Sequence, residues 1–254
     1  MLLKFSPANA KTKRLYQIPG LQKYLQNGRK VYSLDLLSGW TCPGAKDCQA
    51  KVIVDKLGKR KVQDGRDTQF RCFSASQEAL LTPVYNARKH NMELIKGAKT
   101  IQKIRDLIEW SMPKNCGILR WHVAGDFFKR IYLEAAYQVA MNNPTRLFYA
   151  YTKSLKYLAN LSCLNLRKGI ILPNFLVTAS LGGKYDYMIP LLKIRTAKVV
   201  FSESKTRLPI DHTDEFASRP GGNFALLLHS TQPAKTPAAE AWQKIRTTVG
   251  GYSR

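Results

Sequence analysis

Five short apolar runs between residues 118 and 231 dominate the hydropathy pattern of this chain. They cover residues 118–126, 147–154, 175–183, 199–204 and 224–231. Near-continuous apolar runs of this length are typical of strands buried on both faces, as in a parallel sheet with helical crossovers. Each run ends in polar residues, so the pattern places reactive side chains at the carboxyl ends of the predicted strands.

Stretches with helical spacing of apolar residues lie before, between and after these runs. We expect helices over residues 74–92, 98–111, 131–141, 155–165, 185–192 and 238–249. Alternation of strands and helices predicts the α/β class. The more specific prediction is a partial parallel (βα) barrel, TIM-like, with its site at the carboxyl ends of the strands.

The chain is predicted to form a single domain, 1–254, in four parts. Residues 1–31 form a basic lead-in, 32–76 a cysteine-bearing segment with a hairpin, 77–235 the partial βα barrel, and 236–254 a C-terminal helix and tail. The lead-in is either a nucleic-acid-binding arm or a solvated extension. The hairpin is predicted around the turn at residues 57–59.

The charge of the chain is strongly unbalanced. Its 41 Lys and Arg residues stand against 17 Asp and Glu, which gives a net charge of +24. A surface this basic attracts polyanions, and nucleic acid is the commonest of them. A generally basic surface without a specific partner is the alternative.

Neither a signal peptide nor a membrane span is evident in the sequence. The first residues contain no apolar core of the kind a signal peptide needs, and no apolar run reaches the roughly 18 residues of a membrane span. We therefore expect a cytoplasmic protein, in the host cell cytoplasm if it is viral, with no membrane partner. In that compartment five cysteines favour metal or redox chemistry over structural disulfides.

Cys42, Cys48 and Cys72 form the first candidate site. A turn at Pro43-Gly44 separates the first two, and the predicted hairpin returns the chain so that Cys72 can join them. The three thiolates would meet just before a predicted helix, whose N-terminal dipole favours anionic sulfur. Three ligands suit a [4Fe–4S] cluster with one open iron, or a zinc ion with a further ligand such as a His. Simple burial of the three thiols is the remaining alternative.

Polar residues at the predicted strand ends form the second candidate site. The candidates for catalysis are His122, Asp126, Lys153, Asp211, His212 and His229. The candidates for cofactor or substrate binding are Asp126, Ser180 and Glu203. Histidines, a lysine and carboxylates on successive strand ends suit proton transfer or cofactor binding.

Each of these residues also has a purely structural interpretation. His122 could be a hydrogen-bonded core histidine, and Asp126 could cap the helix that follows it. The segment 211–214 could be a polar loop with local Asx turns. The backbone amides of Gly182-Gly183 could cradle an anion, although two glycines alone are weak evidence.

Several common enzyme motifs are absent from the sequence. It contains no Gly-x-Ser-x-Gly elbow, P-loop, dinucleotide fingerprint or His-Glu-x-x-His. The usual hydrolase, NTPase, dehydrogenase and zinc-protease interpretations therefore have no support.

Five segments resemble the "gene product 88" family of phages and plasmids. They are residues 38–45 (SGWTCPGA), 70–79 (FRCFSASQEA), 122–127 (HVAGDF), 148–154 (FYAYTKS) and 208–212 (LPIDH). The resemblance covers about residues 32 to 235. It implies a mobile-element or viral context and supplies no mechanism.

A weaker resemblance is to the radical S-adenosylmethionine enzymes. These have a partial (βα)6 barrel, three cysteines on one cluster before a helix, and a Gly-Glu motif at the end of the second strand, a place that Gly125-Asp126 could take. Their usual Cys-x3-Cys-x2-Cys is replaced here by Cys42-x5-Cys48-x23-Cys72. The resemblance implies a [4Fe–4S] cluster and S-adenosylmethionine as cofactors.

Two functional hypotheses follow from these patterns. The first is an iron–sulfur enzyme, of the radical S-adenosylmethionine type, that acts on a nucleic acid or nucleotide. The second is a non-catalytic nucleic-acid-binding protein with a structural zinc site. A host-targeting inhibitor that works by charge alone is a third possibility.

Overall fold

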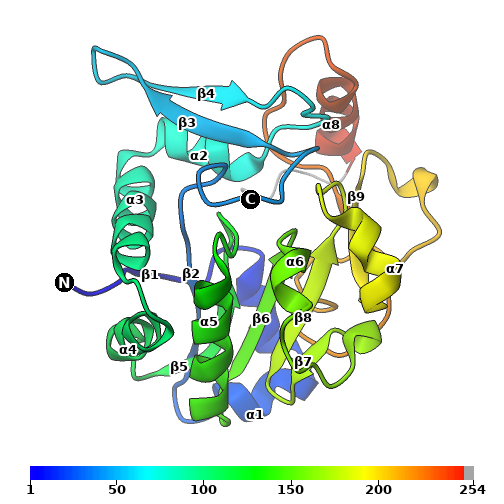
Figure 1. Ribbon diagram of the computed structural model, residues 1–254. Helices are drawn as coiled ribbons and strands as arrows, with labels where there is room; N and C mark the ends of the chain where they lie inside the picture. The colour runs from blue at the N-terminus through cyan, green and yellow to red at the C-terminus, as the bar shows by residue number, and fades with distance from the viewer. Residues whose placement is uncertain (249–254) are drawn as a thin grey trace.

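A mostly parallel sheet forms the centre of the computed structural model, which describes residues 1–248 (Figure 1). The order of its eight strands is β1-β2-β5-β6-β8-β9-β10, and β7 pairs with β8. The strands are β1 (Phe5–Pro7), β2 (Lys30–Leu34), β5 (Cys116–Trp121), β6 (Leu147–Thr152), β7 (Ile170–Leu172), β8 (Phe175–Ser180), β9 (Thr196–Val200) and β10 (Phe224–Leu227).

The parallel strands of this sheet follow one another in sequence order. Five parallel pairings join β2 to β5, β5 to β6, β6 to β8, β8 to β9 and β9 to β10. β1 and β7 are antiparallel to their neighbours. The predicted α/β class with a mostly parallel sheet is therefore confirmed.

The sheet described here stays open and forms no TIM barrel. β1 lies at one edge and β10 at the other, and in residues 1–248 no strand pairing joins these edges. The first parallel strand, β2, already pairs with the antiparallel β1. That pairing occupies the backbone groups which closure of the sheet would use, and it gives the physical reason for the open edge.

Helices connect the strands of the sheet, pack on both of its faces and lie over one of its ends. They are α1 (Gln22–Leu25), α2 (Phe73–Leu80), α3 (Thr82–Gly97), α4 (Ile101–Ser111), α5 (Arg130–Asn142), α6 (Leu155–Leu158), α7 (Ile189–Leu192) and α8 (Pro237–Thr248). Short 3-10 helices are η1 (Thr12–Gln17), η2 (Pro19–Leu21), η3 (Leu166–Lys168), η4 (Asp186–Met188) and η5 (Glu203–Lys205). The predicted hairpin is present as β3 (Ala50–Val54) with β4 (Arg60–Asp64).

Three predicted helices differ from the observed ones. Residues 74–92 form two helices, because Leu81 is extended and Pro83 opens α3. Of residues 155–165 only Leu155–Leu158 are helical. Residues 185–192 form a 3-10 turn followed by one short helix, with Pro190 in its first turn. The predicted tail beyond Thr248 lies outside the described residues.

The two faces of the sheet bury different partners. One face packs Trp121, Phe148 and Val177 against residues of α3, α4 and α5. We call the opposite face the inner face, and it packs Ile118 and Tyr149 against the N-terminal segment. Leu15, Ile18 and Leu21 of that segment are buried there. Residues 12–21 of the predicted lead-in are thus part of the core instead of a free arm.

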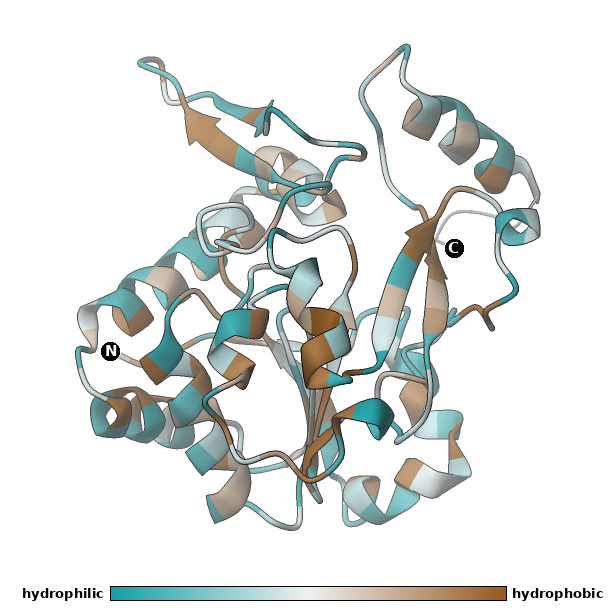
Figure 2. Ribbon diagram, turned by 45° about the vertical axis from the view of Figure 1, so that its right-hand side comes forward, coloured by the Kyte–Doolittle hydropathy of each residue, from teal (hydrophilic) through white to brown (hydrophobic). Residues whose placement is uncertain are grey.

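The cysteine-bearing segment lies over the carboxyl ends of the strands. The hairpin β3–β4, the start of α2 and the C-terminal helix α8 all stand at this end in Figures 1 and 2. Figure 2 shows an apolar stretch on the projecting hairpin, where Ile53 and Val54 are partly exposed. Across residues 1–248, no helix has both the length and the apolar character needed to cross a bilayer.

Candidate functional site

A cavity of about 660 Å³ opens at the carboxyl edge of the sheet. Its wall includes the ends of β5, β6, β8 and β10, the cysteine-bearing segment, the start of α2, and α8. Among the predicted site residues, those that line it are Cys42, Cys48, Cys72, His122, Asp126, Lys153, Ser180 and His229. Residues up to 187 positions apart in the sequence thus share one cavity.

Tight backbone contacts fix the loop that carries Cys42 and Cys48. The amide of Asp47 donates to the carbonyl of Gly182 (3.0 Å), and the amide of Lys184 donates to the carbonyl of Gly44 (2.8 Å). A Cβ on Gly44 would collide with the backbone carbonyl of Lys153. The loop therefore needs glycine at this position in order to lie against the ends of β6 and β8.

A buried ion pair anchors the helix that follows Cys72. Glu78 of α2 is completely buried and accepts a hydrogen bond from Arg88 Nη1 (3.0 Å). It also accepts from the backbone amide (3.1 Å) and the hydroxyl (2.8 Å) of Ser38. These bonds connect the start of the cysteine-bearing segment to α2, so Cys72 has a defined position relative to the Cys42 loop.

The three thiols of the cavity are protonated in the metal-free protein at neutral pH. Burial raises the pKa of Cys42 well above its ordinary value, and the nearby Asp126, Cys72 and Cys48 raise it further. Burial also raises the pKa of Cys48, against the effect of Lys153, and it raises the pKa of Cys72 to about 11. Cys72 and Cys48 therefore act electrostatically on Cys42, and Cys48 acts on Cys72. A bound metal would have to displace their protons.

Asp126 presents a buried carboxylate to the cavity. Its Oδ1 accepts hydrogen bonds from the Phe127 amide (2.7 Å) and the Thr152 hydroxyl (2.6 Å), and Oδ2 accepts from the Lys153 amide (2.8 Å). Burial raises the pKa of Asp126 to about 6, although these hydrogen bonds act in the opposite direction. Oδ2 has room for a further donor from a ligand.

Lys153 joins the ends of two strands. Its ammonium donates to the Ser180 carbonyl and hydroxyl (both 2.9 Å) and to the Leu181 carbonyl (2.5 Å). The side chain is therefore fully engaged, with three acceptors for its three protons. Ser180 accepts from Lys153 and keeps its own hydroxyl proton for another partner.

The Gly182-Gly183 turn does bind an anion, but that anion is part of the chain. Asp186 accepts hydrogen bonds from the amides of Gly182 (2.8 Å) and Gly183 (3.0 Å). The cradle expected from the sequence is thus filled by the carboxylate of Asp186.

His122 points its ring into the core between the sheet and α5. The ring lies against Phe127 and Tyr132, and its Nε2 shares a hydrogen bond of 2.9 Å with the Tyr132 hydroxyl. Burial, together with the charge of Arg120, lowers the pKa of His122 to about 3. The ring is therefore neutral, and its contacts are those of the structural alternative, a hydrogen-bonded core histidine.

His229 also lines the cavity, but its ring lies 4.7 Å from that of Phe73 instead of against Tyr132 in the core. Burial lowers the pKa of His229 to about 4, and the charges of Lys11 and Arg120 act in the same direction. It too is neutral at physiological pH.

Asp211, His212 and Glu203 lie outside the described lining of the cavity. Asp211 accepts from the amides of Thr213 (3.0 Å) and Glu215 (3.1 Å), which is the Asx-turn arrangement. His212 and Glu203 are 45% and 59% exposed and face each other at 3.9 Å. The structure therefore separates these three predicted residues from the others.

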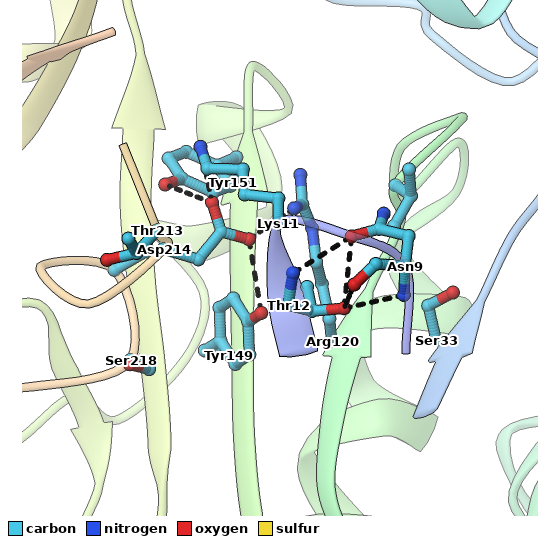
Figure 3. Close-up of polar contacts among 12 residues, drawn as sticks. Asn9, Lys11, Thr12, Ser33, Arg120, Tyr149, Tyr151, Thr213, Asp214 and Ser218 are labelled. Carbon is cyan, nitrogen blue, oxygen red and sulfur yellow. Dashed lines mark hydrogen bonds and ion pairs between the residues drawn. The ribbon is translucent and has the colours of Figure 1, made fainter. Parts of the chain in front are cut away.

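A second polar cluster, which sequence reasoning missed, borders the same cavity on the inner face. Asp214 is completely buried and pairs with Lys11 Nζ (2.7 Å) and Arg120 Nη1. It also accepts from the hydroxyls of Tyr149 (3.1 Å) and Tyr151 (3.3 Å), as Figure 3 shows. Burial would raise the pKa of Asp214, but the two cations lower it to about 2. The only signal in the sequence was a polar residue, Arg120, inside an apolar strand.

Fold and cavity together define an α/β protein with its candidate site at the carboxyl edge of a parallel sheet. Comparison with protein families adds a specific assignment: the profile described as Gene product 88 matches residues 1–244. The chain belongs to the Gene product 88 family. Neither a curated protein nor a solved structure matches it.

Proposed function

We propose that this protein is an iron–sulfur enzyme of the radical S-adenosylmethionine type that acts on a nucleic acid or nucleotide. One observation carries the proposal: Cys42, Cys48 and Cys72 line a single cavity at the carboxyl edge of parallel strands that follow one another in sequence order. In radical S-adenosylmethionine enzymes, too, the cysteines precede a helix and serve a partial (βα)6 barrel.

The order of features along the chain supports this proposal. The cysteine-bearing segment follows β2, the first parallel strand, and α2 begins directly after Cys72. Gly125-Asp126 follows β5, the second parallel strand, where those enzymes have their Gly-Glu motif. The unusual cysteine spacing is explained by the hairpin β3–β4, which lies between Cys48 and Cys72.

A cluster requires less closeness of its ligands than a single metal ion does. Within residues 1–248, no three His, Cys, Asp or Glu side chains are close enough to hold one metal ion. A cubane cluster takes each thiolate on a different iron, so its ligands need not meet at one point. Cys42, Cys48 and Cys72 would hold such a cluster, which would supply electrons for reductive chemistry on S-adenosylmethionine.

Asp126 and Ser180 are the groups best placed to orient the cofactor or substrate. Asp126 is held by three donors and can accept one more hydrogen bond at Oδ2. Ser180 is held by Lys153, and its hydroxyl can donate. Glu203, which the sequence suggested for this role, is not part of the proposal because it does not line the cavity.

His229 is the acid–base candidate that stays at the cavity. Its neutral ring can accept or donate a proton, whereas the ring of His122 is occupied by Tyr132 in the core. Lys153 acts as a positioning residue, because its three protons are used within the chain. The net charge of +24 supports a polyanionic substrate.

The test is the iron content and visible spectrum of protein purified without oxygen. We expect about four irons per chain and a broad absorption band at about 400 nm. Both should be lost in Cys72→Ala and retained in Cys163→Ala, a matched variant of a cysteine outside the cavity. Stoichiometric zinc without colour would instead favour the structural-zinc hypothesis. Retention of iron in Cys72→Ala would overturn the proposed ligand set.

A further inference from the structure

Five cations and one carboxylate line the cavity: Lys11, Arg71, Arg120, Lys153 and Arg246, and Asp126. Behind the lining, Asp64 pairs with Arg71, and Asp214 pairs with both Lys11 and Arg120. Asp211 also acts on Lys11, and Asp35 acts on Arg120. The cations therefore line the cavity, whereas most of their counter-charges lie behind its lining.

Arg120 is held in place without being fully hydrogen-bonded. Its side chain is only 10% exposed, and it lies over the ring of Tyr151 at 5.3 Å. Nη1 donates to Asp214, whereas Nε is buried and has no partner anywhere in residues 1–248. A buried guanidinium with an unused donor is costly unless something else accepts from it.

Lys11 reaches the same carboxylate from the other side of the cavity. It comes from the N-terminal segment, just before η1, and its side chain is 16% exposed. Asp214 pairs with both cations, and both line the half-open cavity. Burial lowers the pKa of His229, and the charges of Lys11 and Arg120 lower it further, against the effect of Asp214.

We propose that Lys11 and Arg120 form an anion subsite that binds a phosphate group of the substrate, with Asp214 as the residue that positions both cations. The inference rests on the proposed function, because it assigns a substrate group to the same cavity. Arg supplies a planar fork and Lys a point charge, and the two together suit the several oxygens of a phosphate.

A phosphate fits this subsite better than a carboxylate does. Lys11 and Arg120 line the cavity, and Arg71 and Arg246 line it as well. A phosphate brings up to two negative charges and accepts from several directions, whereas a carboxylate brings one charge in one plane. The substrate class is therefore a phosphate-bearing molecule, such as a nucleotide or the end of a nucleic-acid strand.

The experiment is calorimetric titration of the full-length protein with inorganic pyrophosphate at low salt, and with malonate as the carboxylate probe. We expect saturable binding of one pyrophosphate per chain and weaker binding of malonate. Lys11→Met should weaken pyrophosphate binding about tenfold, since it removes one charged hydrogen bond. Asp214 keeps Arg120, Tyr149 and Tyr151 in that variant, so the fold should survive.

Lys103→Met is the matched control, because Lys103 is an exposed lysine on α4 with the same charge change. It should leave pyrophosphate binding unchanged. Equal losses in both variants would mean that pyrophosphate senses only the net charge, and they would overturn the subsite. Preference for malonate, or no saturable binding, would overturn it as well.

Arg120→Lys is the second variant, in case Lys11→Met does not fold. It keeps the charge and removes the fork, and pyrophosphate binding should again fall about tenfold. Iron content is measured on the same samples. Normal iron without pyrophosphate binding rejects the subsite alone, and pyrophosphate binding without iron rejects the cluster alone.

Discussion

The thiol end and the Asp214 end of the cavity differ in how completely their polar groups are paired. At the Asp214 end, one buried carboxylate receives hydrogen bonds or ion pairs from Lys11, Arg120, Tyr149 and Tyr151. At the thiol end, three half-buried cysteines line the cavity, and burial raises the pKa of each of them.

Asp214 is a structural centre, whereas the three thiols belong to the cavity alone. Asp214 joins three distant segments, namely the N-terminal segment, the sheet and the loop before β10. Loss of its charge should cost stability. The thiols of Cys42 and Cys72 interact with backbone amides close in sequence, so loss of the thiols should cost iron binding and little stability.

The largest expected effect is that of Asp214→Asn on the free energy of unfolding. The substitution removes the ion-pair partner of Arg120 and Lys11, and removal of one partner from a buried ion pair costs about 3–5 kcal/mol. Asn is the suitable replacement because Asp214 has φ 61°, a region that Asn tolerates. Urea unfolding followed by circular dichroism measures the change.

Glu215→Gln is the matched control for that variant. Glu215 is the next residue and pairs with Arg219 on the surface. Exposed pairs of this kind contribute about 0–1 kcal/mol, so the midpoint should barely move. If both variants lost the same small amount, Asp214 would not be the structural centre described here.

The second largest expected effect is a pH dependence of the free energy of unfolding that comes from Asp126. Its pKa is raised from about 3.9 in the unfolded chain to about 6 in the folded protein. A raised pKa gives stability that is present below about pH 4 and is lost as pH rises through about 6. At about 1.4 kcal/mol per pKa unit the loss is about 3 kcal/mol at most.

Unfolding free energies of the wild type and Asp126→Asn between pH 4 and pH 7.5 test this effect. The wild type should lose stability relative to the variant as the pH rises, because the variant has no carboxylate to ionise. Asp67 lies on the exposed turn after the hairpin. The free energy of unfolding of Asp67→Asn should therefore depend on pH in the same way as that of the wild type. If the wild type and Asp126→Asn showed the same pH dependence, burial would not raise the pKa of Asp126 in the folded protein.

Much of the sheet could be predicted, because buried parallel strands give continuous apolar runs. The five predicted runs contain β6, β8 and β10, most of β5 and the end of β9. The order of pairing and the open edge could not be predicted, since they depend on which strand edges are already occupied. The break at Leu81 was missed because the helical stripe continues across Pro83, and the apolar residues of the N-terminal segment were overlooked among its basic ones.

The thiol end of the site was easier to predict than the Asp214 end. Cysteines are rare, and the hairpin between Cys48 and Cys72 gave a local reason for them to meet. Arg120 and Asp214 lie 94 positions apart, and Asp214 sits in an irregular loop without periodicity. Single-sequence patterns contain no signal for such a pair, because it exists only after the loop and the N-terminal segment pack on the inner face.

Gly44→Ala should lower the free energy of unfolding by an intermediate amount and should also lower the iron content. A Cβ here would collide with the Lys153 carbonyl, which is backbone and cannot rotate away. Overpacking of this kind costs about 1–3 kcal/mol, and it would displace the loop that carries Cys42 and Cys48. Gly20→Ala is the control, because a Cβ on Gly20 would meet nothing within 4 Å. The free energy of unfolding, measured with urea, and the iron content should both fall for Gly44→Ala. Neither should change for Gly20→Ala.

The smallest expected effect on stability is that of the cysteines themselves. In metal-free protein, Cys42→Ala or Cys48→Ala removes one sulfur from the border of a cavity, so the free energy of unfolding should change by about 1 kcal/mol or less. The same variants should fail to bind iron, which Asp214→Asn should still bind whenever it is folded. A loss of several kcal/mol in metal-free Cys42→Ala would mean that the thiols are core residues, and the contrast between the two ends would then disappear.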